Sequence, residues 1–422
     1  MLMSFMSLLA SAQIQPNLVL SPNIHSVRFH VYGDQLGMPI YRLNSTERLE
    51  LHFDDMDNRV KAYFYTYQLC DYNWRPINMS AFDYIKGFTQ QRITTYRFSS
   101  QSFSRYTHYQ AILPEANSVP SRSGNYILKV FLDGDTSKLV FTRALLVLDT
   151  KATVGGQMMQ PFQPQFFRTH QRIRFDVRMS SGINSFNANQ QVKVRVLQNQ
   201  RWDKSMGEQI LPTFVRGSLL EYNMENQFLF PSGKEWRWAD LRSFRLLGDR
   251  VDSGYIRPDS AAMFMRVDQD LSTQRYVFFA DMNGLYQATT YESINPYWQA
   301  DYAKVHFRFL PPGGRPYPNR QQLFLVGQLT DYQKGGKAQM QYNERTGLYE
   351  TTLWLKQGFY NYGYELIDSD GDQPIQNLDG DYWETENIYT ILVYYKGFAD
   401  QHDQLIGVGT IRTRLDRPGL SF

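Results

Sequence analysis

Acidic side chains are the residues of this chain that come nearest to a recognisable chemical motif. Residues 368–372 read Asp-Ser-Asp-Gly-Asp, and carboxylate oxygens at alternate positions are the ligands from which calcium loops are built. In such a loop glycine occupies the sixth position and a bidentate glutamate the twelfth. Here the glycine is fourth and the twelfth residue is Asp379, so a solvated turn explains the segment better than a metal site.

The other reactive side chains form no known catalytic or ligand-binding motif. The sequence contains no H-E-x-x-H, no G-x-S-x-G, no phosphate-binding glycine loop and no Cys/His cluster. Its single cysteine, Cys70, excludes an intramolecular disulfide and lies in the aromatic run of residues 63–70, where a small buried hydrophobe is expected. We therefore expect no catalytic residue, no metal ligand and no cofactor.

Histidines and carboxylates are scattered along the chain rather than gathered at metal-ligand spacings. Within strand patterns, a surface histidine or one with a hydrogen-bond partner is expected rather than a ligand, and this applies to His30, His52, His108 and His306. Carboxylates such as Asp54 and Asp55 are abundant, but nothing in the sequence separates their pKa values into an acid and a base.

Composition indicates a sheet protein with no preference for nucleic acid. The 422 residues include 44 basic and 41 acidic side chains, a formal net charge of +3, so neither nucleic acid nor an anionic surface is implied as a partner. Aromatic residues reach 15%, with 29 Tyr and 28 Phe, which is typical of half-buried sheet faces. Surfaces that stack on sugars are the alternative explanation of the same excess.

Alternating apolar residues recur along the chain and predict antiparallel strands. Residues 24–32 and 48–54 alternate in this way, and residues 388–414 read as two such strands joined by the polar tip 397–403, which predicts a hairpin. Helical periodicity is nearly absent. The fold class expected is therefore all-β, with tandem antiparallel sandwich domains of the Ig-like or E-set-like kind and little helix.

The N-terminus has the features of a secretory signal. Residues 1–12 are apolar and end in Ala10-Ser11-Ala12, small residues that suit cleavage before Gln13, although no Lys or Arg precedes Arg28. No other run approaches the roughly 20 apolar residues that span a bilayer. We expect an exported protein with no transmembrane segment.

Breaks in the strand pattern divide the mature chain. The run of Pro and Gly between residues 155 and 165 is expected to interrupt regular structure. The organisation predicted is a signal peptide (1–12), an N-terminal β-sandwich (13–150), a linker or crossover (151–168), a middle β-domain (169–299) and a C-terminal β-sandwich (300–422).

The C-terminal domain resembles the β-sandwich modules that bind glycogen and starch. Residues 323–364 contain L-F-L-V-G-Q-L-T-D-Y, then M-Q-Y-N-E-R-T-G-L-Y-E and G-F-Y-N-Y-G-Y-E, close to the three sequence blocks of those modules. The pattern encodes strand, turn and strand. Sugar binding would in addition need exposed aromatic rings, for which Tyr332 and Trp354 are the candidates. An exported carbohydrate-binding protein is thus one alternative for function.

Segments along nearly the whole mature chain also resemble the plug proteins of the type IX secretion system. In the N-terminal domain they include I-H-S-V-R-F, Y-R-L-N-S-T-E-R-L-E-L-H-F-D-D and L-C-D-Y-N-W-R-P. Further along come H-Q-R-I-R-F-D-V, V-L-Q-N-Q-R-W-D and A-D-Y-A-K-V-H-F, and finally V-Y-Y-K-G-F-A-D with D-Q-L-I-G-V-G. No single segment is specific to this family, but the occurrence of all of them in the same order along the chain is.

This resemblance implies a non-enzymatic periplasmic protein, associated with the outer membrane through its partner. The partner would be the SprA/Sov-type outer-membrane β-barrel translocon, whose pore the protein would occlude when no substrate is in transit. We expect a monomer within a heteromeric complex. Pro-rich, irregular segments are the candidates for the contact, and the residues in them are Phe162, Phe166, Phe167, Arg315 and Tyr317.

Overall fold

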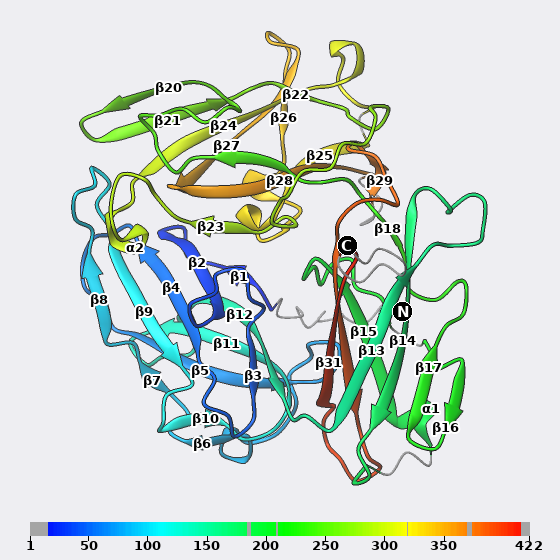
Figure 1. The fold of residues 1–422 in the computed structure, drawn as a ribbon. Coiled ribbons are helices and arrows are strands. Elements are labelled where there is room, and N and C mark those ends of the chain that lie inside the picture. The colour runs from blue at the N-terminus through cyan, green and yellow to red at the C-terminus, as the bar shows by residue number, and fades with distance from the viewer. Residues whose placement is uncertain (1–15, 184–186, 208–209, 319, 369–373, 415–422) are drawn as a thin grey trace, which may run out of the picture.

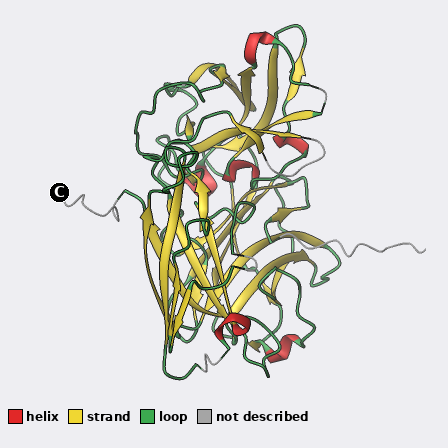
Figure 2. Ribbon diagram, turned by 90° about the vertical axis from the view of Figure 1, so that its right-hand side faces the viewer, coloured by secondary structure: helices red, strands yellow, loops and turns green. Residues whose placement is uncertain are grey.

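The computed structural model describes residues 16–183, 187–207, 210–318, 320–368 and 374–414. Strands make up 48% of the structure and helices 5%, so the all-β prediction is confirmed. Figure 1 shows three β-domains in mutual contact, with the third at the top, the first at lower left and the middle one at lower right. In Figure 2 the few helices are short turns between strands. The predicted signal peptide lies outside the described residues, as does most of the acidic turn at 368–372.

The first domain is a sandwich of two sheets closed over an aromatic core, and its strand pairs are antiparallel except for β3 with β12. One sheet has the order β1-β12-β11-β5-β7, with β3 paired to β12, and the other has the order β2-β4-β9-β8. Phe53, Tyr63, Tyr109 and Phe141 pack between them with ring centroids about 5 Å apart. The elements are β1 (Leu18–Val19), β2 (Ile24–Val31), β3 (Ile40–Arg42), β4 (Leu49–Asp55), β5 (Tyr63–Cys70), η1 (Ala81–Asp83), β6 (Ile85–Gly87), β7 (Gln91–Arg92), β8 (Thr95–Phe98), β9 (Thr107–Leu113), β10 (Ser118–Pro120), β11 (Gly124–Leu132) and β12 (Leu139–Leu148).

The middle domain combines strands from two distant parts of the chain. Its sheets have the orders β13-β14-β17-β16, with β18 paired to β14, and β15-β30-β31. Phe175, Tyr222 and Tyr389 are buried between them. The elements are β13 (Ala152–Met159), β14 (His170–Met179), α1 (Ala188–Gln191), β15 (Val192–Gln198), β16 (Phe214–Arg216), β17 (Leu219–Tyr222), β18 (Leu229–Pro231), β30 (Ile388–Tyr395) and β31 (Gln404–Arg412).

The third domain is a sandwich inserted between the two parts of the middle domain. Its sheets have the orders β20-β21-β24-β27-β26 and β19-β28-β23, with further strands on β24 and β28. Phe307, Phe309, Tyr362 and Tyr364 fill its core. The elements are β19 (Arg237–Asp240), β20 (Val251–Arg257), β21 (Ser260–Met265), β22 (Asp268–Gln269), β23 (Tyr286–Ala288), α2 (Pro296–Gln299), β24 (Tyr302–Leu310), η2 (Pro312–Gly314), β25 (Gln321–Val326), η3 (Gln328–Thr330), η4 (Gly336–Ala338), β26 (Gln341–Asn343), β27 (Leu348–Lys356), β28 (Gly358–Asp368) and β29 (Pro374–Asn377).

The segment predicted as a linker or crossover, 151–168, is instead regular structure in its first half. Residues 152–159 form strand β13, which pairs with β14 along its whole length. Gly156 lies within the strand and pairs with Phe175. A Cβ at this position would lie 2.8 Å from the Phe175 Cβ and from the Arg174 carbonyl oxygen. Glycine is therefore the residue that allows close packing at this point.

The predicted C-terminal domain, residues 300–422, is also misplaced at both of its ends. Strand β21 pairs in parallel with β24, and β19 and β23 pair with β28, so the chain from about residue 237 already belongs to the third domain. The final hairpin forms as predicted but pairs through β30 with β15, in the middle domain. Alternation identifies a strand without naming the distant strand beside it, which is why the boundary was misplaced.

Candidate functional site, a buried polar network between the first and third domains

The outward face of one sheet in the first domain carries a cluster of buried ionisable side chains. Along β4, Leu51 and Phe53 point into the core, so Glu50, His52 and Asp54 point outward. In a two-sheet sandwich such a face is normally solvated. Here helix α2 and strands of the third domain cover it, and His52 and Asp54 are almost completely buried.

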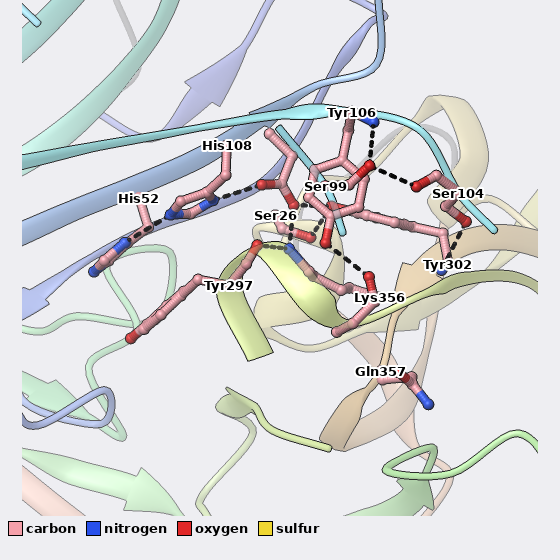
Figure 3. Close-up of polar contacts among 12 residues, drawn as sticks. Ser26, His52, Ser99, Ser104, Tyr106, His108, Tyr297, Tyr302, Lys356 and Gln357 are labelled. Atoms are coloured by element: carbon pink, nitrogen blue, oxygen red, sulfur yellow. Dashed lines mark hydrogen bonds and ion pairs between the residues drawn. The ribbon is translucent and has the colours of Figure 1, made fainter. Parts of the chain in front are cut away.

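Asp54 is the centre of this network (Figure 3). Its carboxylate accepts hydrogen bonds from His108 Nδ1 at 2.7 Å, from Lys356 Nζ at 2.6 Å and from the Tyr302 hydroxyl. Lys356 also donates to the carbonyl of Tyr297. Lys356 and Tyr302 belong to the third domain, so a single buried carboxylate is bonded by both domains.

Burial and pairing act in opposite directions on the two charged groups. Burial would raise the pKa of Asp54, but the charge of Lys356 and the hydrogen bond from His108 hold that pKa below its ordinary value. Burial lowers the pKa of Lys356, and Asp54 opposes this shift. A buried ion pair that is bonded on both sides is costly to break, because removing one partner leaves the other charge unpaired.

A second set of hydrogen bonds continues the contact beside Asp54. The Tyr302 hydroxyl lies 2.7 Å from Ser26 Oγ, and its amide donates to Ser104 Oγ at 3.1 Å. Tyr106 donates its hydroxyl proton to the Ala300 carbonyl at 2.7 Å, and the Lys356 ammonium lies 4.3 Å from the Tyr106 ring centroid. These bonds fix the start of β24 against the first domain.

The histidines of this face form a chain rather than isolated surface residues. His52 Nδ1 lies 3.1 Å from His108 Nε2, and the Tyr297 ring stacks on His52 with centroids 3.9 Å apart. His30, on the adjacent strand β2, is also buried, and burial lowers the pKa of His30 and His52 to about 4. The imidazoles of both residues are therefore neutral at physiological pH.

Polar and ionic contacts also join the middle domain to the other two. Arg201 and Lys204, which follow β15, contact Glu365 of the third domain at 3.0 and 2.6 Å. Tyr72 of the first domain donates its hydroxyl proton to the Val194 carbonyl at 2.8 Å, and Tyr394 donates to Asn125 at 2.8 Å. Every pair of domains is thus joined by buried polar contacts.

The predicted glycan-stacking residues are placed differently from each other. Tyr332 is half-buried: Arg201 lies 4.7 Å from its ring centroid, Trp236 packs edge-on against it, and its hydroxyl donates to Gly284. Trp354 is 38% exposed and contacts His25 and Tyr302. Tyr332 therefore offers no open platform, while Trp354 is partly accessible. Glycan binding stays a prediction.

The five predicted contact residues lie in two turns of different domains. Phe162 and Phe167 are 77% and 44% exposed, whereas Phe166 is half-buried against His170. Arg315 is exposed. Tyr317 is half-buried, with its ring on Tyr349 and its amide donating to the Tyr349 hydroxyl.

The buried network was missed by sequence reasoning. The alternation Glu50-x-His52-x-Asp54 placed three ionisable groups on one face of one strand, and that signal was present in the sequence. What it did not contain was the third domain that covers this face. His108, on the same covered face, has a hydrogen-bond partner as expected, the Asp54 carboxylate. The pair lies in the interior rather than at the surface.

The chain is thus a protein of three β-sandwich domains that buried polar contacts join to one another. Residues 24–149 match the family model described as the type 9 secretion system plug protein first domain, so this part of the chain is similar to the first domain of the type IX secretion plug family. This confirms the resemblance recognised in the sequence and supports a role related to type IX secretion. Among curated proteins, no relative matches the chain significantly.

A solved structure shares the architecture over almost the whole length. It is the crystal structure of a hypothetical protein from Parabacteroides merdae, 25% identical in sequence, with a TM-score of 0.88. The match covers 94% of this chain and 98% of the other. Among the described residues, no helix is long and apolar enough to cross a bilayer.

Proposed function

We propose that this protein is a non-enzymatic periplasmic plug of the type IX secretion system. It would dock on the SprA/Sov-type outer-membrane β-barrel translocon and occlude the pore when no substrate is in transit. The observation that carries the proposal is the match of residues 24–149 to the first domain of the plug family. Steric occlusion needs a body that keeps its shape and a surface that fits a partner, and it needs no reacting group.

The contacts between domains support the rigidity that this function requires. The Asp54–Lys356 pair joins the first and third domains, and the contacts of Glu365 join the middle and third. Interfaces that are small and polar normally allow domains to move. Here a shared apolar cluster, which includes Cys70, Leu148 and Leu392, adds a core between the first and middle domains.

We propose the turn around Phe162 as part of the docking surface. The Phe162 amide donates to Glu225 at 2.5 Å, which places this turn beside the segment that leads into β18. Gln227 of that segment donates to the Leu211 carbonyl, just before the edge strand β16. Large exposed hydrophobics gather on these connected segments: Phe162, Leu211, Phe214, Val215 and Met224. Exposed apolar surface beside an open sheet edge is typical of a protein-binding site.

Affinity purification tests the proposal. The tagged, signal-cleaved protein is recovered from detergent-solubilised outer membranes of its native host, and co-eluting proteins are identified by mass. We expect a stoichiometric, very large β-barrel partner, with less of it recovered by Phe162→Asp. Phe82→Asp is the matched control, because Phe82 is equally exposed (78%) but lies on the first domain. Recovery of the protein alone would contradict the proposal and direct attention to glycan binding at Trp354.

A further inference from the structure

Three potential metal ligands meet on the outward face of β2 and β4. His30 and Glu50 are direct partners across the two strands, and His52 follows Glu50 by two positions, so all three share one face. One ligand atom from each residue lies within 4.8 Å of the others. This site adjoins the Asp54 network but includes none of the groups that bond Asp54.

The Nε2 atoms of His30 and His52 are buried and have no hydrogen-bond partner among the described residues. Both histidine residues are 1% exposed. Glu50 Oε2 lies 3.7 Å from His52 Nε2, which is beyond hydrogen-bonding distance. Burying polar atoms without partners is unfavourable, so the arrangement is better suited to coordination than to packing.

Hydrogen bonds behind the two imidazoles fix which nitrogen is free. His30 Nδ1 lies 2.8 Å from the Val31 carbonyl, which can only accept, so Nδ1 carries the proton and Nε2 presents a lone pair. His108 donates from Nδ1 to the Asp54 carboxylate, and its Nε2 then accepts from His52 Nδ1. His52 Nε2 is therefore also a lone pair. A carbonyl partner behind a ligating histidine, as behind His30, is typical of metal sites, and behind His52 the corresponding partner is His108, which is itself bonded to a carboxylate.

We propose that His30, Glu50 and His52 bind one divalent transition-metal cation, with Zn²⁺ as the best fit. Two imidazole nitrogens and one carboxylate oxygen are a donor set that suits Zn²⁺, with water at the fourth position. Arg28 is the charged neighbour on the same strand face, but its guanidinium donates to Gln328 and to the Gln35 carbonyl. The proposal goes beyond the plug function and does not depend on it.

The ion would stabilise the junction of the first and third domains. It would cross-link β2 to β4 directly beneath the Tyr297 ring, which stacks on His52. Since Tyr297 belongs to helix α2 of the third domain, orienting His52 also orients the surface on which that domain rests. Metal binding to the folded chain alone raises its resistance to unfolding.

A Co²⁺ titration tests the site directly. The chelator-treated, signal-cleaved full chain is titrated with Co²⁺, whose visible absorption reports bound nitrogen ligands, and Zn²⁺ is then added. We expect one Co²⁺ per chain, displaced by one Zn²⁺, and a melting temperature that rises with Zn²⁺. His30→Asn should weaken binding at least about tenfold. His306→Asn is the matched control, a half-buried strand histidine bonded to Thr352.

A second variant, at the partly exposed residue Glu50, keeps the test valid if His30→Asn does not fold. Glu50→Gln changes only the charge of a residue that is less buried than the two histidines. It should also weaken Co²⁺ binding. The melting temperature of the metal-free variant should stay near that of the metal-free wild type. Wild-type protein that shows no Co²⁺ absorption would overturn the proposal. Equal Co²⁺ affinity in the wild type and in Glu50→Gln would overturn it as well.

Discussion

Lys356 and Asp54 show how much of the contact between two domains can depend on single side chains. Asp54 is fully buried, and its partner Lys356 is 2% exposed. Each group would be unfavourable alone in the interior, and only their pairing with additional hydrogen bonds makes burial tolerable. The same reasoning applies to Glu365, which faces Arg201 and Lys204 in the second contact between domains.

Removing the lysine should be strongly destabilising. We expect Lys356→Met to lower the free energy of unfolding by about 3–5 kcal/mol, because Asp54 would remain buried without its cation. Urea denaturation followed by tryptophan fluorescence measures the change. Lys138→Met removes an ion pair with Asp133 in which both groups are about half exposed, and it should leave the midpoint unchanged. Similar midpoints for the two variants would contradict the importance of the buried pair.

Glu365 should make stability dependent on acid pH. Burial raises its pKa, but Lys204 and Arg201 outweigh this and lower the pKa to about 2, against about 4.3 in an unfolded chain. Between these values the unfolded state binds more protons, so this contribution is present above pH 4.3 and is lost as the pH falls toward 2. Glu365→Gln should cost about 1.5–3 kcal/mol at pH 7 and flatten this dependence. Parallel pH profiles of urea midpoints for the two proteins would refute the assignment.

Sequence patterns identified the types of these residues but not their surroundings. His30, His52 and His108 were placed correctly in strands, and an outward-facing histidine on a sandwich reads as a surface residue. The partners that bury this face, among them Tyr297 and Lys356, come from a domain about 200 residues or more further along the chain. Local alternation contains no information on a contact of that range.

Among the secondary-structure elements, strand β13 illustrates how glycine can support a sheet rather than interrupt it. The adjacent residues Gly155 and Gly156 led to the prediction of a linker, yet both lie inside β13. Their side-chain positions alternate: a Cβ on Gly155 would meet open space, whereas one on Gly156 would meet Phe175 and Ile411 within 3 Å. The final hairpin, with its clear alternation and polar tip, was predicted correctly as an element.

This pair of glycines provides a matched test of the strand. Gly156→Val should destabilise the protein by about 1–3 kcal/mol, because the new side chain overlaps the Phe175 Cβ and the Arg174 carbonyl. Gly155→Val should be neutral or slightly stabilising, since its side chain enters open space on a strand. Thermal melts of the two variants distinguish them. A linker that is not packed, as the sequence suggested, would tolerate both substitutions equally.

For the whole molecule, the important feature is that the chain returns to its middle domain at the end. Strands β30 and β31 complete a sheet begun by β15, about 190 residues earlier. The third domain is therefore anchored at both of its ends in the middle domain. Together with the Asp54 and Glu365 contacts, this topology favours a single rigid body, which a pore-occluding protein requires.

The topology predicts which fragments can fold. A fragment of residues 300–422 should be unfolded, because β28 would lose β19 and β23, and β30 would lose β15. A fragment of residues 16–149, which contains all strands of the first domain, should fold. Circular dichroism and dispersion of amide proton resonances measure both. A folded 300–422 fragment would restore the domain boundary predicted from sequence.

The measurement that tests the central claim most directly is the conductance of the purified translocon barrel in a planar lipid bilayer. Addition of this protein to the periplasmic side should close the open pore, and Phe162→Asp should close it less effectively than Phe82→Asp. Channels that keep their full conductance at saturating protein concentration would contradict the account, whatever affinity the two partners show for each other.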